Sequence, residues 1–324
     1  MNRAWTMASI AALALGACDA AGAGEVAGRE EQAVSASGCR ETVLPWGSGR
    51  GQVGLAPGGP ERLARGPMAV AVEPTGAVLV LDQENGRALR VVAGGVEVAA
   101  EGIARHADDL AAGDGLAVGS ELAGVVWLRD EKGAPAGEVA VPRALRGVVG
   151  IELGASRRVA VRTGLQERFV LGSPAAPRDL ATVLRGKAEG AVATAAGGAA
   201  VLAGADGVEL VVTRAAAGER AQVAARHRLP GAAQAAALFG AAGDIVCARV
   251  EAVDRATSTV RVERRAVCVD ATTGAVVIDR RLPARGLYLP RQELALGGPA
   301  EAPRLASIHA AEDGLRVETC EVKR

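Results

Sequence analysis

Glycines that follow a short apolar run recur along the chain at similar intervals. Successive members of this set lie 39, 39, 43, 46 and 54 residues apart. One four-stranded antiparallel sheet with its turns needs about 40 to 50 residues, and repeats of this length are typical of β-propellers. The spacing therefore predicts an all-β fold of six sheets. The glycines are Gly76, Gly115, Gly154, Gly197, Gly243 and Gly297, and the sheets are expected at 66–104, 107–142, 144–186, 188–230, 232–284 and 286–322.

Two other interpretations use the same residues. A β-sandwich with a second domain also needs many short strands, but it does not predict a regular spacing over most of the chain. Alanine-rich stretches at 188–200 and 231–242 have a high helix propensity. Glycines interrupt both stretches, and their place in the repeat favours inner strands that pack closely around a narrow central channel.

The first repeat has the clearest strand pattern. Its residues 66–92 contain three apolar runs, separated by a Pro-Thr-Gly turn and an Asn-Gly-Arg turn, which predicts a three-stranded meander. The segment resembles an NHL repeat, in which the second strand ends in an aspartate and Asn-x-Arg leads into the third. Asp82, Asn85 and Arg87 match that pattern, and Gly76 supplies the first turn. The resemblance implies one propeller blade, in which Asp82 and Arg87 bond the turn and the neighbouring strand.

The two ends of the folded region are expected to meet. Residues 41–57 supply an early strand that pairs with the last sheet, because this closing pair removes an open sheet edge. The expected fold is thus a six-bladed propeller over 39–324, closed by its N- and C-terminal strands. Cys39 and Cys320 lie at these two ends, where a disulfide would lock the closure.

The cysteines beyond Cys18 number four, an even count that fits disulfides in an exported protein. Strands expected at 244–253 and 260–270 form a hairpin, and if its register sets Val253 opposite Val262, Cys247 lies opposite Cys268. Cross-strand Cβ atoms about 4.5–5.5 Å apart are close to disulfide reach. The remaining pair is Cys39 with Cys320. A zinc site is the alternative use of these cysteines, although they lack Cys-x-x-Cys spacing.

The N-terminus has the pattern of an export signal. Residues 1–17 contain an early arginine, a short apolar run and then small residues, and the run is too short to span a membrane. Leu15-Gly16-Ala17-Cys18 resembles the lipobox of bacterial lipoproteins, which implies cleavage before Cys18 and lipidation of its sulfur. Residues 18–38 then form a flexible tether. The resemblance implies an exported protein anchored to the cell envelope, and it leaves open the inner or outer membrane and ordinary cleavage with an unmodified Cys18.

Composition argues against nucleic acid as a partner. The 324 residues include 37 basic and 37 acidic side chains, so the chain has no net charge with which to attract a polyanion. Only six residues are aromatic, too few for a platform on which bases stack. The expected contacts are the membrane, through the lipid, and a protein or small molecule in the envelope.

Residues typical of catalysis are few. A solvated loop is expected for His106, and structural positions are expected for His227 and His309. No phosphate-binding glycine loop with a Lys-Ser or Lys-Thr ending and no Gly-x-Ser-x-Gly nucleophile elbow is present. We therefore predict no catalytic residue, no metal site and no cofactor.

Acidic residues beside the second repeat are the remaining candidates. Asp108-Asp109, together with Asp114, could contact a cation, although Gly113-Asp114-Gly115 is also an ordinary turn. The leading functional hypothesis is a lipid-anchored propeller that acts as a binding or scaffolding module. The alternatives are a degenerate metal-dependent hydrolase or lyase, and a structural envelope protein.

Overall fold

The computed structural model describes most of the chain beyond residue 38. The described ranges are 39–59, 64–145, 147–190, 192–194, 197–204, 207–214, 222–230, 233–254, 261–283 and 286–323. The expected signal peptide, Cys18 and the tether lie outside them. Within them, no helix is both long and apolar enough to cross a membrane.

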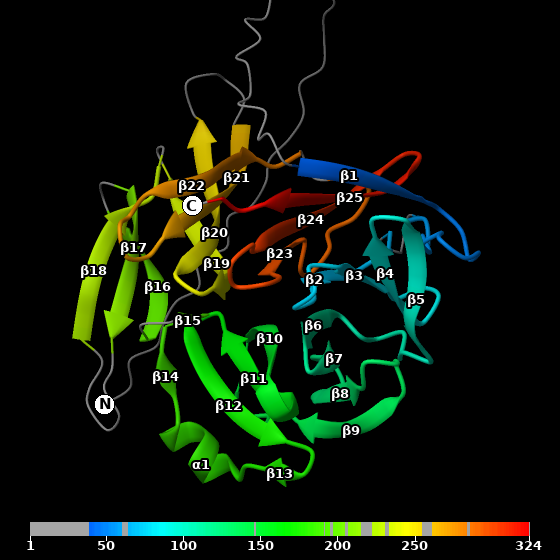
Figure 1. Ribbon diagram of the computed structural model, residues 1–324, viewed down its shortest axis with the longest axis horizontal. Helices are drawn as coiled ribbons and strands as arrows, with labels where there is room; N and C mark the ends of the chain where they lie inside the picture. The colour runs from blue at the N-terminus through cyan, green and yellow to red at the C-terminus, as the bar shows by residue number, and fades with distance from the viewer. Residues whose placement is uncertain are drawn as a thin grey trace, which may run out of the picture. The chain divides into compact units, whose positions relative to one another are not determined.

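Six antiparallel sheets follow one another around a central axis and form a six-bladed β-propeller (Figure 1). The first sheet contains β2 (Ala69–Val72), β3 (Val78–Asp82), β4 (Arg87–Val92) and β5 (Gly95–Glu101). The second contains β6 (Asp109–Gly113), β7 (Gly115–Ser120), β8 (Val125–Arg129) and β9 (Pro135–Ala140). The third contains β10 (Val148–Gly154), β11 (Arg158–Thr163), β12 (Glu167–Ser173), β13 (Ala176–Pro177) and β14 (Ala188–Glu189).

The remaining sheets complete the ring. The fourth contains β15 (Val192–Thr194), β16 (Gly197–Gly204), β17 (Gly207–Arg214) and β18 (Gln222–Arg228). The fifth contains β19 (Ala235–Ala242), β20 (Ile245–Asp254), β21 (Arg261–Asp270) and β22 (Val276–Arg281). The sixth contains β23 (Leu294–Gly297), β24 (Arg304–Ala311), β25 (Gly314–Glu321) and β1 (Cys39–Pro45). The first strand of the first sheet, β2, contacts both β6 and β23, so the last sheet returns to the first.

The turn glycines lie where the first strand of each sheet turns into the second, either in the turn or at the strand end beside it, as the spacing predicts. Gly115 shows why glycine is needed there: its φ is +103°, and a Cβ would collide with the carbonyl oxygen of Arg129. Gly297 has a different reason, because a Cβ there would lie 2.6 Å from the carbonyl oxygen of Val72 in the neighbouring sheet. The repeat spacing is therefore set by tight turns and by close packing between sheets.

Apolar side chains are buried between adjacent sheets. Leu79 of the first sheet packs in one cluster with Leu110 and Val118 of the second. Val246 and Val267 of the fifth sheet share another cluster with Leu210 of the fourth. Burial contributes about 25 cal/mol per Å² of apolar surface, so the packing between neighbouring sheets stabilises the ring.

The structure corrects three details of the expected fold. The closing strand pairs with the last sheet as predicted, but β1 runs over Cys39–Pro45, so it begins before residue 41 and ends well before residue 57, because side chains of the first sheet hold residues 47–54 as a loop. Strand β14 pairs with β12 of the third sheet, so 188–189 does not belong to the fourth. A short helix, α1 (Leu180–Arg185), also lies in the third sheet's range, where Asp179 caps it by accepting from the Thr182 amide.

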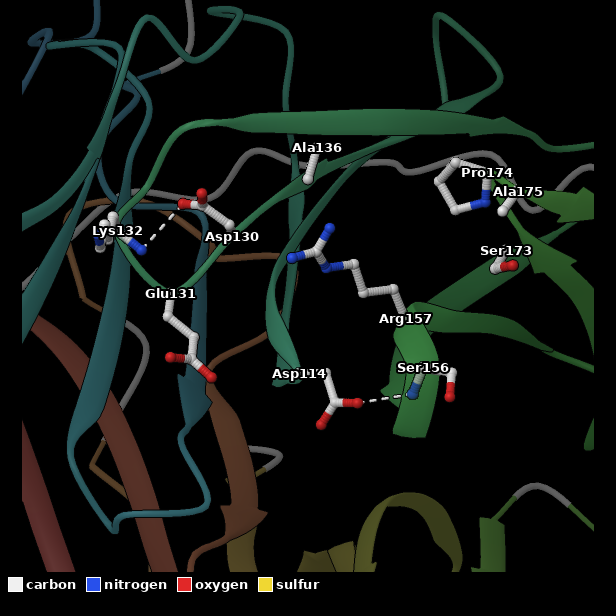
Figure 2. Close-up of a pocket in the computed structure, with 10 residues that line it drawn as sticks. All are labelled: Asp114, Asp130, Glu131, Lys132, Ala136, Ser156, Arg157, Ser173, Pro174 and Ala175. Atoms are coloured by element: carbon white, nitrogen blue, oxygen red, sulfur yellow. Dashed lines mark hydrogen bonds between the residues drawn. The ribbon is translucent and has the colours of Figure 1, made fainter.

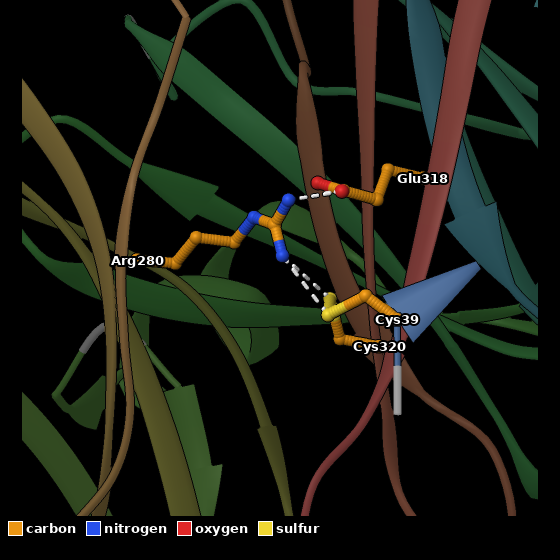
Figure 3. Close-up of a disulfide and its surroundings, with 4 residues drawn as sticks. All are labelled: Cys39, Arg280, Glu318 and Cys320. Carbon is orange, nitrogen blue, oxygen red and sulfur yellow. Dashed lines mark hydrogen bonds and ion pairs between the residues drawn. A yellow bond between two sulfur atoms is a disulfide. The ribbon is translucent and has the colours of Figure 1, made fainter. Parts of the chain in front are cut away.

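Two disulfides confirm the predicted pairings. Cys247 and Cys268 lie opposite each other on β20 and β21, in the register that also pairs Val253 with Val262. Cys39 and Cys320 pair across β1 and β25 and close the ring (Figure 3).

Arg280 lies against the closing disulfide. Its Nη1 is 2.9 Å from the Cys39 sulfur, and its Nη2 donates to Glu318. The described domain is therefore fastened at the same edge by backbone pairing, a covalent bond and an ion pair.

Candidate functional site

Arg162 occupies the central channel although it belongs to β11, the second strand of its sheet. Its guanidinium passes over Gly150 of β10, where any Cβ would collide with it. Nη1 then donates to the carbonyl oxygen of Leu238 on β19, at 3.0 Å. The side chain is 7% exposed. Arg162 therefore joins the third and fifth sheets across the axis, and it lines two channel cavities of about 290 and 560 Å³.

Arg291 joins three sheets at one end of the channel. It precedes β23, and its Nη1 donates to Asp108 Oδ2 at 3.0 Å and to Glu121 Oε2 at 2.6 Å. Its Nη2 donates to the carbonyl oxygen of Val148 at the start of β10. We call this end of the propeller the mouth face, because the first strands β6 and β10 begin there.

A separate cavity of about 270 Å³ lies beside Arg291, between the second and third sheets, and we call it the side pocket. It has mostly apolar walls and a few charged groups, the usual composition of a small-molecule site. The apolar part includes Val125, Val126, Val141, Leu145, Val148 and Ile151. The charged side chains are Asp108, Asp109, Glu121, Arg143 and Arg291.

Asp109 is the buried carboxylate of this pocket, with 2% of its surface exposed. Its Oδ1 accepts from the Leu110 amide at 2.9 Å, whereas its Oδ2 has no hydrogen-bond partner among the described residues. Burial raises the pKa of Asp109 to about 7, against the opposing charges of Arg291 and Arg162. The carboxyl group can therefore gain or lose a proton near neutral pH.

Unsatisfied polar atoms gather at the mouth face. Six buried side-chain atoms of the described residues lack a hydrogen-bond partner, and all but the Arg264 Nε belong to residues that line the side pocket or the larger channel cavity. Buried polar groups are nearly always bonded, so such a concentration needs an explanation. The five atoms are Asp109 Oδ2, Arg162 Nε, Thr163 Oγ1, Arg249 Nε and Gln292 Oε1. The two arginine Nε atoms nevertheless face carboxylates, Glu152 at 3.6 Å and Glu251 at 3.3 Å, so the oxygens are the atoms without any partner among the described residues.

The structure separates the acidic residues that the sequence grouped together. Asp108 and Asp109 lie at the start of β6, on the mouth face. Asp114 follows the end of β6, at the opposite face, where its Oδ2 accepts from the Ser156 amide at 2.6 Å. The three carboxylates therefore cannot bind one cation.

The opposite face has its own pocket of about 710 Å³, formed by turns of the second and third sheets (Figure 2). Arg157 extends across it, while Asp130 Oδ1 accepts from the Lys132 amide at 2.9 Å. Asp114 and Glu131 are exposed to solvent. None of the buried unsatisfied atoms found among the described residues lies here, so this pocket is the weaker candidate.

The NHL-like residues hold the chain segment before the first sheet. Asp82 Oδ1 accepts from the Gly54 amide at 2.9 Å, and Oδ2 accepts from Asn85 Nδ2 and Arg87 Nε at 2.8 and 2.9 Å. Arg87 also donates to the carbonyl oxygen of Gln52, at 2.8 Å. These side chains therefore bond one another and the 47–54 loop.

None of the three histidines lines the side pocket or the two channel cavities. His106 is exposed in a turn, with its ring edge-on to Trp127. The His227 ring contacts the carbonyl oxygen of Ala271 through Nε2 at 3.0 Å, and His309 lies on β24. Among the described residues, no group of three or more His, Cys, Asp or Glu side chains could hold a metal ion.

Two mouth-face residues, Arg162 and Arg291, were not found by sequence reasoning. Arg162 could have been noticed in the sequence, because a charged residue directly after the apolar residues Val159–Val161 is unusual in a buried strand. Arg291 had none, because its partners Asp108 and Glu121 lie far away in the chain.

The chain matches no protein-family model and no curated protein. Its structure is similar to that of a streptogramin B lyase at 10% identity and TM-score 0.45, covering 88% of this chain and 98% of the other. It is also similar to the WD40 repeats of RRP9, at 10% identity and TM-score 0.44, covering 90% and 99%. A PQQ-bound aldose sugar dehydrogenase from Streptomyces coelicolor matches at 14% identity and TM-score 0.40, covering 88% and 98%. At this level of similarity no activity is carried from these proteins to this chain.

Proposed function

We propose that this protein is an exported, lipid-anchored propeller that binds a small organic molecule in the side pocket. The observation that carries the binding role is Asp109, a buried carboxylate with one unpartnered oxygen in a largely apolar cavity. Leaving a buried acceptor unsatisfied costs about 1–3 kcal/mol, and more when it is charged. A ligand that bonds this oxygen would offset that cost.

The size and position of the pocket also support binding. A volume of about 270 Å³ suits a compact molecule, and a rigid ring of sheets holds the pocket walls in place. Arg291 forms one wall and is itself fixed by Asp108 and Glu121. The site is therefore pre-organised, which lowers the entropic cost of binding.

A pocket-filling substitution tests the binding role. Val125 lines the side pocket from β8, so Val125→Phe should fill it. Compounds from a panel of small organic cations, neutral molecules and anions should raise the melting temperature of the wild type and not of this variant. Val223→Phe is the matched control, since Val223 is 53% exposed on β18 in the fourth sheet. The proposal fails if no compound distinguishes Val125→Phe from the control.

The anchoring role rests on the lipobox-like residues Leu15 to Cys18. Two or more acyl chains on one cysteine hold a protein at a membrane more firmly than a single reversible chain. Mass spectrometry of protein extracted from membranes should find residues 1–17 removed and Cys18 acylated. Cys18→Ser should release the protein from the membrane fraction, and an unmodified Cys18 in the wild type would contradict the anchor.

A further inference from the structure

The charges around the side pocket are not balanced. Asp108 and Asp109 contribute two carboxylates, and Arg291 is the half-buried cation that faces them. Glu121 and Arg143 also line the pocket, but both are exposed to solvent, where their charges are screened. Asp109 and Arg162 lie near enough to interact electrostatically, although Arg162 bonds Leu238 and not Asp109.

Arg291 does not neutralise Asp109 directly. Its Nη1 bonds Asp108 and Glu121, and its Nη2 bonds the Val148 carbonyl oxygen. The Asp109 Oδ2 is thus left without a donor among the described residues. When Asp109 is ionised, a ligand group that meets this oxygen must donate a hydrogen bond, and a positive charge on that group would also compensate the carboxylate charge.

The apolar side chains of the side pocket determine which ligand body fits beside the donor group. Val126, Leu145 and Ile151 are buried side chains that line the pocket, so they favour an apolar body. An anionic ligand would meet the carboxylates of Asp108 and Asp109, and a neutral donor would leave the charge of ionised Asp109 uncompensated. The two requirements together describe an amine with a compact hydrocarbon skeleton.

We infer that the side pocket binds a small organic ammonium cation, whose N–H groups donate to Asp109 Oδ2 while its apolar body packs against Val126, Leu145 and Ile151. This inference rests on the proposed binding function and names the ligand class for that same pocket. Binding adds one ion pair and transfers no atoms.

Three probes with the same ring and different head groups test the charge requirement. Benzylamine, benzyl alcohol and benzoate should be titrated into the purified full chain in detergent, at pH 8 by calorimetry. We expect benzylamine to bind at least about tenfold more tightly than benzyl alcohol, and benzoate to bind most weakly. Benzylamine affinity should rise between pH 6 and pH 8, because Asp109 ionises in that range while the amine stays protonated.

Asp109→Asn keeps the shape of the side chain and removes its charge. It should weaken benzylamine at least about tenfold, leave benzyl alcohol nearly unchanged and remove the pH dependence. Asp114→Asn is the matched control, because that carboxylate lies at the opposite face of the propeller. It should leave all three affinities unchanged.

The outcomes separate the two proposals. Failure of benzylamine to bind, tighter binding of benzoate, or an Asp109→Asn variant that binds benzylamine normally would each overturn the cation inference. If benzoate or benzyl alcohol then binds in a way that Val125→Phe abolishes, the small-molecule function stands without its cationic ligand. If no compound in the wider panel depends on Val125, the binding function itself fails.

Discussion

Asp82 and Asp109 are both buried aspartates, and they lie in neighbouring sheets at the end of β3 and the start of β6. They are 0% and 2% exposed. Asp82 accepts three hydrogen bonds, one of them from the Arg87 guanidinium. Asp109, which lines the side pocket, accepts one, from the next amide in the chain, and its second oxygen has no described partner.

The two carboxylates differ in where their hydrogen bonds are made. The bonds of Asp82 are all made within the protein, and they tie the 47–54 loop to the first sheet. Asp109 has an unused acceptor and a pKa that burial raises to about 7. Burial alone therefore does not assign a role to an aspartate, whereas the number of protein donors that reach it does.

The same substitution at both positions should have opposite consequences. Asp82→Asn should lower the free energy of unfolding by about 3–5 kcal/mol, because it leaves the buried Arg87 guanidinium without its counter-charge. Urea unfolding at pH 7 with the disulfides intact measures this loss. The control is Glu41→Gln, which breaks the exposed Arg316–Glu41 pair and should cost less than about 1 kcal/mol. A loss at Asp82 as small as that of the control would contradict the structural role.

Asp109→Asn should be stabilising above pH 7. The pKa of Asp109 is raised from 3.8 to about 7 in the folded protein, so the folded state binds more protons than the unfolded state between these values. Wild-type stability should therefore fall as the pH rises from about 4 to about 7, by up to about 4 kcal/mol. The variant lacks this titration, and its unfolding free energy should change less over that range. Equal slopes for the two proteins would show that Asp109 titrates normally.

The hydrogen-bonded group around Asp82 was predictable from sequence. Asp82, Asn85 and Arg87 lie within six consecutive residues of one meander, so their pattern could be read directly. The blade boundaries followed from turn glycines for the same reason, and the Cys247–Cys268 bond followed from one hairpin register. Each of these features depends on residues close together in the chain or on a simple strand pairing.

The mouth face was not predictable, because its residues come from separate sheets. The sequence suggested Asp108, Asp109 and Asp114 as one acidic group, but a strand of five residues places Asp114 at the other face. Arg291 reaches Asp108 only because the ring brings the sixth sheet back to the second. The burial of Asp109 and the lack of a partner for its Oδ2 likewise exist only in the closed propeller.

The smallest expected effects concern the charges that surround Asp109. Arg291→Gln removes a cation that lowers the pKa of Asp109, so this pKa should rise above about 7. Asp108→Asn removes an anion that raises it, so the pKa should fall, and by less, because Asp108 influences Asp109 more weakly than Arg291 does. NMR titration of carboxyl carbons in protein labelled at aspartate would follow both shifts.

Opposite signs for these two variants would establish that Asp109 responds to the mouth-face charges and not to burial alone. Asp130→Asn provides the control, since Asp130 lies in a turn at the opposite face and should leave the Asp109 titration unchanged. If Arg291→Gln instead lowered the pKa of Asp109, the loss of Arg291 would have opened the pocket to water, because better solvation favours the charged carboxylate. Arg291 would then act on Asp109 chiefly by excluding solvent. A ligand cation would have to displace water from the Asp109 carboxylate.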